Sequence, residues 1–177
     1  MSESAPDSIA RVHAHIDRVT RRLHLVHAAR SQCREGCSSC CVDDLTVFEV
    51  EAAHVRLHHR ELLATGAPHA TGACAFLDER GACRIYAERP YVCRTQGLPL
   101  RWSEEEGDRV IELRDICPLN EAGEPIAQLP AGACWTLGPV EERLALLQLA
   151  AEPGSSRVRL RDLFANASLP LDGSDAA

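Results

Sequence analysis

Apolar positions near the start of the chain predict a long amphipathic helix from Ser8 to about Arg30. They recur at alternating steps of three and four, the period of one helix face; they are Ile9, Val12, Ile16, Val19, Leu23 and Val26. Arg and His crowd the opposite face, and residues 1–34 hold six Arg against three acidic residues, net +3. The pattern favours a solvated face, with a docking surface for an acidic protein partner or nucleic acid as the alternative.

Two further helices are predicted downstream. Thr46 and Glu49 have the spacing of a capping box and predict a helix that continues to about Leu63. Pro139 suits the first turn of a third helix. The apolar positions of this third helix fall on one face; they are Val140, Leu144, Leu147 and Ala151.

A β-hairpin is predicted between the second and third helices. Residues 97–102 and 109–114 can pair across a turn at 103–108, and Pro99 should confine its strand to a sheet edge. The acidic run 104–106 then falls in the turn, as a solvated loop. The expected fold class is mainly α with a small β-hairpin (α+β).

Composition limits the chemistry. All 19 basic residues are Arg, which excludes a Schiff-base Lys and a phosphate-loop Lys. The net charge of −7 argues against a general nucleic-acid partner. The chain is 45% hydrophobic but only 4% aromatic, so a core of Ala, Leu and Val needs further stabilisation.

The expected compartment decides how the cysteines are interpreted. The first residues, MSESAPDS, lack the basic and apolar regions of a secretory signal. No apolar run approaches the ~20 residues that span a bilayer. We therefore expect a cytoplasmic protein without a membrane partner, in which cysteines bind metal or act in catalysis more often than they form disulfides.

Nine cysteines dominate the candidate chemistry. Eight of them match two tetrahedral four-sulfur metal sites, with Cys134 left over; the eight are Cys33, Cys37, Cys40, Cys41, Cys74, Cys83, Cys93 and Cys117. Cys40 and Cys41 are adjacent, so their side chains should point in different directions. They serve different centres, or one of them bridges, or the two form a strained vicinal disulfide, which would be a redox exception.

The spacing Cys33-x3-Cys37-x2-Cys40 also matches the cluster loop of radical S-adenosylmethionine enzymes. Those enzymes usually carry an aromatic where this chain has Ser39, and they need most of a barrel of ~200 residues or more. The chain therefore does not match a radical S-adenosylmethionine enzyme. Such a loop can still hold three irons of a [4Fe–4S] cluster, with a distant Cys as the fourth ligand.

The cysteine motifs carry a family resemblance. The segment CREGCSSCC, then CAFLDERGACRIYAERPYVCR and Cys117-Pro118, resembles the YkgJ-type cysteine-cluster family over about residues 33–118. That family is described as a zinc- or iron-chelating domain with eight characteristic cysteines, and the resemblance gives these roles to the eight cysteines above. The first gap here is three residues, where the usual family pattern has two.

Side chains beside the cysteines suggest how a site would be supported. Arg84, Arg89 and Arg94 can donate hydrogen bonds to sulfur or to nearby carbonyls. Four aromatics lie within three residues of a Cys and could form an apolar wall; they are Phe76, Tyr86, Tyr91 and Trp135. The pairs His54/His58 and His24/His27 have ligand spacing, but a polar helix face is favoured for both.

These observations favour a cytoplasmic metal-binding protein that holds zinc, in a structural or metal-handling role without catalysis of its own. A [4Fe–4S] iron protein that uses the Cys33, Cys37 and Cys40 loop is the first alternative, and a thiol redox switch is the second. We expect irregular Cys-rich loops organised around metal centres. The chain then divides into a basic amphipathic helix (1–32), the cysteine-cluster domain (33–118), a helical segment that packs on it (119–166) and a disordered tail (167–177).

Overall fold

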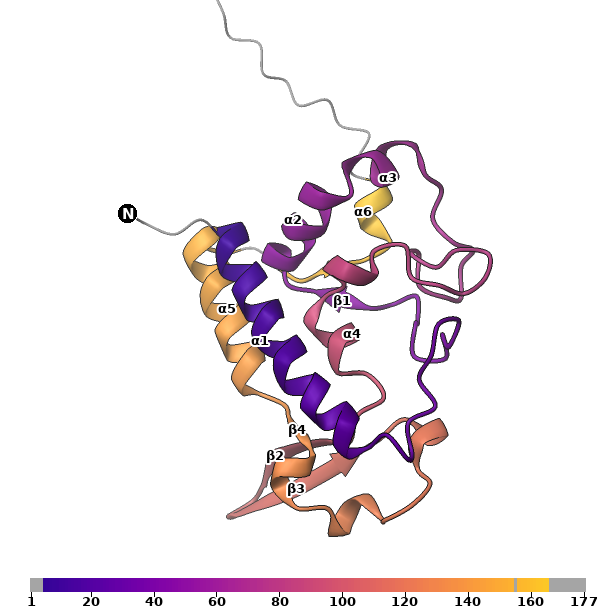
Figure 1. Ribbon diagram of the computed structural model, residues 1–177. Helices are drawn as coiled ribbons and strands as arrows, with labels where there is room; N and C mark the ends of the chain where they lie inside the picture. Colours follow the sequence, from indigo (N-terminus) through magenta and orange to yellow (C-terminus); the bar gives the residue numbers. More distant parts are fainter. Residues whose placement is uncertain (1–4, 155, 166–177) are drawn as a thin grey trace, which may run out of the picture.

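The computed structural model describes residues 5–154 and 156–165 of the chain, so the predicted tail at 167–177 lies outside the described residues. Two helices, α1 (Ala5–Val26) and α5 (Pro139–Ala151), lie side by side, and α2 (Glu49–His58) packs against both (Figure 1). Small sheets and irregular loops complete an α+β fold, which confirms the expected fold class. Across the described ranges, no helix is both long enough and apolar enough to cross a membrane.

The first predicted helix is confirmed, with different ends. α1 begins at Ala5 and ends at Val26, before the predicted Arg30. Ile9, Ile16 and Leu23 are buried on its apolar face, as the periodicity predicts. Val26 is exposed, because it is the last helical residue and lies beyond the core on which the helix packs.

The second predicted helix starts later and is broken. Thr46 is no helix cap: it lies in the strand β1 (Thr46–Val47), which pairs with β5 (Val158–Arg159), and Phe48 precedes α2 instead. Arg157 donates hydrogen bonds to the Thr46 hydroxyl and carbonyl, which holds this segment extended. After α2, a separate helix α3 (Arg60–Thr65) completes the predicted range.

The hairpin is present, but its turn is shorter than predicted. β2 (Leu100–Glu106) pairs antiparallel with β3 (Arg109–Asp115) around Gly107, whose φ of 62° suits the first central position of a two-residue turn. The acidic run 104–106 therefore lies in a strand. The edge assignment was also wrong: β2 is the central strand, with β4 (Trp135–Thr136) parallel on its other side. Pro99 does not remove a hydrogen bond from this central strand, because it lies just before the first strand residue.

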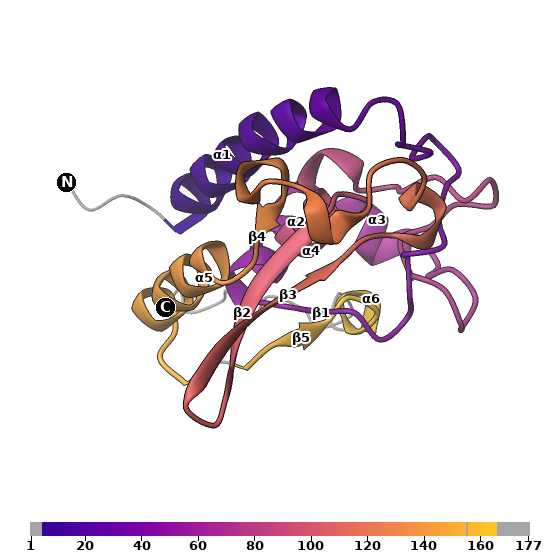
Figure 2. The same ribbon diagram turned by 90° about the horizontal axis from the view of Figure 1, so that it is seen from below.

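Two apolar clusters form the main core, and α2 contributes to both. One contains Val50 of α2 with residues of α1, α5 and β4. The other contains Ala52 and Val55 of α2, packed with residues of α6 (Asp162–Ala165) and of the loops that carry the central cysteines. In Figure 2 the hairpin extends away from the helices. Residues of the cysteine loops thus pack against the helical core through α2.

Arginine side chains fix the irregular loops. Arg161 donates to Asp43 and to three backbone carbonyls of residues 69–73. Arg114 donates to the carbonyls of Ile126 and Leu129. A guanidinium offers five donors in a rigid fork, so one side chain can satisfy several carbonyls of a loop without regular structure. The all-arginine composition therefore has a structural use.

Candidate metal centre

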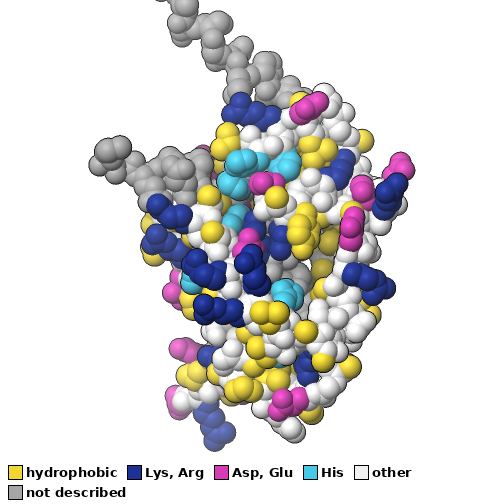
Figure 3. Space-filling model, viewed as in Figure 1, with side chains coloured by type: hydrophobic (Ala, Val, Ile, Leu, Met, Phe, Trp, Pro, Cys, Tyr) yellow, Lys and Arg dark blue, Asp and Glu magenta, His cyan; other side chains and the backbone are white. Residues whose placement is uncertain are grey.

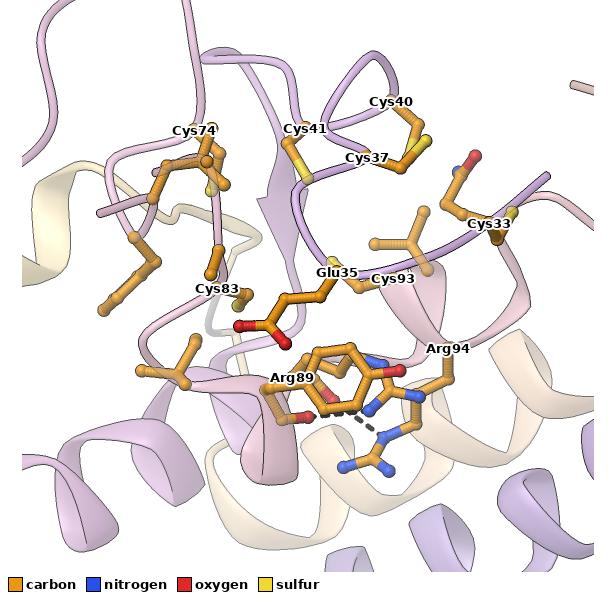
Figure 4. A pocket seen from close by; sticks show the side chains of 18 of the residues that line it. Cys33, Glu35, Cys37, Cys40, Cys41, Cys74, Cys83, Arg89, Cys93 and Arg94 are labelled. Atoms are coloured by element: carbon orange, nitrogen blue, oxygen red, sulfur yellow. Dashed lines mark hydrogen bonds between the residues drawn. The ribbon is translucent and has the colours of Figure 1, made fainter. Parts of the chain in front are cut away.

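Seven of the eight predicted ligands line a single cavity of about 570 Å³. They come from the first cysteine loop, from the segment 74–83 and from α4 (Tyr91–Thr95); they are Cys33, Cys37, Cys40, Cys41, Cys74, Cys83 and Cys93 (Figure 4). Cys117 is not among the lining residues and lies at the start of the 3-10 turn η2 (Pro118–Asn120). Cys134 is buried elsewhere, in a cluster with Leu129 and Ala133.

Tight turns hold the first cysteine loop. The Cys37 amide donates to the Arg34 carbonyl and the Cys41 amide to the Ser38 carbonyl, at 3.0 and 2.9 Å. Gly36 has a φ of 82°, a conformation that L side chains rarely adopt. These turns bend the chain back within the nine residues that carry the first four cysteines.

The remaining thiols are held by backbone pairing to this loop and to each other. The Cys74 amide donates to the Cys41 carbonyl at 2.8 Å, and Cys83 forms an isolated antiparallel bridge with Leu77. Cys93 lies on the short helix α4, which packs against α1. Three separate segments thus meet at one cavity.

The thiols in this cavity influence one another electrostatically. Burial raises the pKa of Cys74 and of Cys83. Burial also raises the pKa of Cys93, and the neighbouring thiols Cys74 and Cys83 raise it further. Clustered thiols away from water therefore favour the neutral form, whereas a bound cation would stabilise the thiolates and release their protons.

Cys40 and Cys41 form a coupled pair. A hydrogen bond from the Cys41 thiol stabilises the Cys40 thiolate and lowers the pKa of Cys40 to about 6. The same hydrogen bond, with burial, raises the pKa of Cys41. Cys40 is thus a thiolate at neutral pH in the metal-free protein, ready to act as a ligand or a nucleophile.

The donor set fits the metal groups that the sequence suggests. Sulfur is the preferred donor for structural zinc and for iron–sulfur clusters, and this cavity offers seven sulfurs from one chain. Within residues 5–154 and 156–165, no three His, Cys, Asp or Glu side chains form a group arranged to hold a metal ion. The thiols share a cavity without closing around one point.

The predicted supporting residues divide between the cavity and the core. Arg84, Arg89 and Arg94 all donate to backbone carbonyls, as predicted. Phe76 and Tyr86 line the cavity. Tyr91 and Trp135 do not: they are joined by a 2.9 Å hydrogen bond and pack in the core between α1 and α5.

The two histidine pairs have different environments. His24 lines the thiol cavity, whereas His27 is buried and bonds to the Ala133 carbonyl, so this pair is separated. The rings of His54 and His58 lie 4.4 Å apart between centroids, and the Nδ1 atom of His54 is buried without a hydrogen-bond partner. Burial is the main cause that lowers the pKa of His54, to about 4.

Sequence analysis missed two residues of the site. Glu35 lines the cavity, and in Figure 4 its carboxylate is drawn toward the side of Cys83 and Arg89. Asn120 is fully buried, and its Nδ2 atom lies 3.4 Å from Cys33 Sγ. Only its position two residues after Cys117-Pro118 could have pointed to Asn120, because nothing in a lone Asn indicates a sulfur contact.

A family comparison agrees with this geometry. Residues 32–118 match the model of the CxxCxxCC family, whose printed description is "Putative zinc- or iron-chelating domain". No curated protein and no solved structure gives a significant match to the chain. The matched segment carries all eight predicted ligands and all seven thiols of the cavity. Residues 32–118 of this chain therefore belong to the CxxCxxCC family of zinc- or iron-chelating domains.

Proposed function

We propose that the protein is a cytoplasmic metal-binding protein that holds zinc through the eight cysteines, without catalysis of its own. The observation that carries this proposal is the convergence of seven thiols on one cavity. Eight sulfurs supply two closed four-sulfur sites, and closed sites are typical of structural zinc. Zinc binding would also stabilise cysteine loops that have little regular structure of their own.

Purification under nitrogen tests the choice of metal. We expect a colourless protein with about two zinc ions per chain by elemental analysis, the number that eight thiolates can bind in tetrahedral sites. Removal of zinc with a chelator should lower the melting temperature, because metal binding is coupled to folding. A metal-free protein after anaerobic reconstitution with zinc would contradict the proposal.

One specific observation favours the [4Fe–4S] alternative. Cys33, Cys37 and Cys40 have the spacing of a cluster loop, and all three line the cavity. A brown protein with absorption near 400 nm, iron and acid-labile sulfide would establish this alternative and sink the zinc assignment.

A partner site on α1 is a further part of the proposal. Arg11, Arg18 and Arg22 recur at helical spacing on the exposed face of α1, and basic side chains gather along this helix in Figure 3. His24, one helical turn after Arg21, lines the thiol cavity. An acidic protein docked along α1 would therefore lie beside the metal site, as metal delivery requires.

Charge reversal tests this partner site. A fluorescent poly-glutamate peptide should bind the protein with an affinity that falls steeply between 50 and 300 mM salt, as expected for exposed charges. Arg18→Glu combined with Arg22→Glu should abolish this binding. Arg60→Glu combined with Arg109→Glu changes the net charge by the same amount at exposed positions outside α1. This matched control should retain most of the binding. Equal loss in both variants would show that the peptide responds only to net charge.

A further inference from the structure

The buried carboxamide of Asn120 connects three separate segments of the chain at Cys33. Its Oδ1 atom accepts a hydrogen bond from the Gln32 amide at 2.7 Å, and its Nδ2 atom donates to the Gly97 carbonyl at 2.7 Å and to Cys33 Sγ at 3.4 Å. Asn120 is only 1% exposed, so these bonds leave it a single orientation. The amide donor is thereby aimed at one sulfur.

Gly97 completes a close-fitting site for the same sulfur. A Cβ atom at residue 97 would lie 2.4 Å from Cys33 Sγ and 3.2 Å from Asn120 Nδ2. The φ of Gly97 is 86°, a backbone conformation that residues other than glycine rarely adopt. Only glycine allows both this backbone conformation and the approach of the sulfur, so the position of Cys33 Sγ is specified from two sides.

Cys117 belongs to the same corner of the fold. The Asn120 amide donates to the Cys117 carbonyl at 2.8 Å, so one short turn connects the cysteine with the residue that contacts Cys33. In Figure 4 the Cys33 side chain lies apart from Cys41, Cys74 and Cys83, with Cys37 and Cys40 between them. Cys33 is therefore directed to a different point from the central thiols.

The central thiols form a second group. Cys41 and Cys74 are joined by a backbone hydrogen bond of 2.8 Å, and Leu77, which bridges to Cys83, donates its amide to the Cys74 carbonyl. Cys93 lies within electrostatic range of Cys74 and Cys83, and also of Cys40 from the first loop. All four of these cysteines line the cavity.

We propose that the eight thiols form two separate four-sulfur centres and that Asn120 is a positioning residue of one of them. The first centre uses Cys41, Cys74, Cys83 and Cys93, and the second uses Cys33, Cys37, Cys40 and Cys117. The adjacent residues Cys40 and Cys41 serve different centres. An amide donor strengthens when its acceptor is a thiolate, so Asn120 stabilises the ligand form of Cys33. This inference rests on the proposed function.

Cobalt titration of the full chain tests the division. Metal-free protein prepared under nitrogen is titrated with Co²⁺, and tetrahedral thiolate absorption and bound cobalt are measured together. The parent chain should bind about two ions, the number that eight thiolates can bind in tetrahedral sites. Cys33→Ser and Cys83→Ser should each lose one ion, and the double variant should lose both. A double variant that loses no more than either single variant would overturn the division but not metal binding.

Substitution of Asn120 separates positioning from general stability. Asn120→Ala should lower the affinity for one of the two ions by roughly 10- to 100-fold, the usual effect of removing a residue that hydrogen-bonds to a metal ligand. The ion that remains strong should be the one retained in Cys33→Ser. Asn120→Asp keeps the acceptor for the Gln32 amide but places an anion beside the sulfur, and should weaken the same ion at least as much. Gln96→Ala, which removes another carboxamide from the cavity wall, is the control.

Two outcomes would contradict the inference about Asn120, and a third would contradict the proposed function. Equal weakening of both ions would show a structural role only. Full affinity in both Asn120 variants would remove any role. Failure of the parent chain to bind cobalt or zinc would instead contradict the proposed function itself. Far-UV circular dichroism of each variant identifies any that fails to fold, and Cys33→Ser then still tests the division.

Discussion

Arg94 and Asp17 form an ion pair that ties the cysteine region to α1. The Arg94 Nη1 atom lies 2.7 Å from Asp17 Oδ2 and 2.8 Å from Oδ1, across 77 residues of sequence. Arg94 directly follows Cys93, is 4% exposed, and also donates to the carbonyls of Ala87 and Arg89. One buried guanidinium therefore fixes both the helix α4 that carries Cys93 and its packing on α1.

Loss of Arg94 should destabilise the whole protein. Arg94→Leu removes the donors of two carbonyls and the partner of Asp17, whose side chain is 40% exposed. It should lower the free energy of unfolding by about 2 kcal/mol, mainly because the two carbonyls lose their charged donor. Urea denaturation measures this change. Arg18→Leu on the exposed face of α1 is the control, for which a change within about 0.5 kcal/mol is expected. Equal changes would contradict the role assigned to Arg94.

His54 should make stability depend on pH. Its pKa in the folded protein is lowered to about 4 by burial and by His13 and His58, from an ordinary value of 6.5. The unfolded chain therefore binds more protons at acidic pH, and stability falls as pH decreases from about 6.5 to 4. The loss should be on the order of 2–3 kcal/mol, because one pKa unit corresponds to about 1.4 kcal/mol.

The variant His54→Leu isolates this contribution. Urea denaturation at pH 7, 5.5 and 4.5 should show that the free energy of unfolding depends less on pH in the variant than in the parent chain. Thiol protonation contributes equally to both chains, so it cancels when the two are compared. His15→Leu replaces an exposed histidine and should keep the parent slope. An unchanged slope in His54→Leu would show that this histidine does not carry the effect.

Cys40 should be the most reactive thiol of the metal-free protein at neutral pH. Its pKa of about 6 makes it mostly thiolate at pH 7, and the cause is the hydrogen bond from Cys41. Cys41→Ala should slow alkylation of Cys40 by iodoacetamide at least about tenfold, as its pKa returns toward that of an ordinary thiol. Mass spectrometry of the alkylated peptides measures the rate.

The control for Cys40 is Ser38→Ala, which changes the same loop without altering the thiol pair. Its alkylation rate should match that of the parent chain. Bound zinc should protect Cys40, because a coordinated thiolate is a poorer nucleophile. Rapid, reversible oxidation of Cys40 in the zinc-loaded protein would instead favour a thiol redox switch.

Leu144 should be a main contact between α5 and the rest of the core. It is fully buried in the cluster that contains Ile16 of α1 and Val50 of α2. Leu144→Ala should lower the free energy of unfolding by about 2–5 kcal/mol, the cost of a cavity in a packed core. Leu149→Ala on the same helix removes a side chain that is 60% exposed and should have a small effect. Similar losses in urea denaturation would contradict this packing.

Local patterns predicted the elements whose residues interact mainly with near neighbours. The apolar stripe predicted α1, and Pro139 marked the start of α5. The capping box at Thr46 failed, because Arg157 and the strand β5 hold that residue in an extended conformation. The edge assignment of β2 failed because the pairing with Trp135 of β4 comes from a distant segment. Both errors arise where a long-range contact outweighs a local preference.

The sequence by itself determined the donor chemistry of the site: eight cysteines in a pattern that matches a metal-chelating family, with arginine as the only basic side chain besides histidine. Only the tertiary structure decided which side chains meet. It directed seven thiols to one cavity, separated Cys134 from them, and brought Asn120 to Cys33 across 87 residues. Spacing along a chain sets which atoms are available, whereas packing of distant segments sets the distances on which coordination and hydrogen bonding depend.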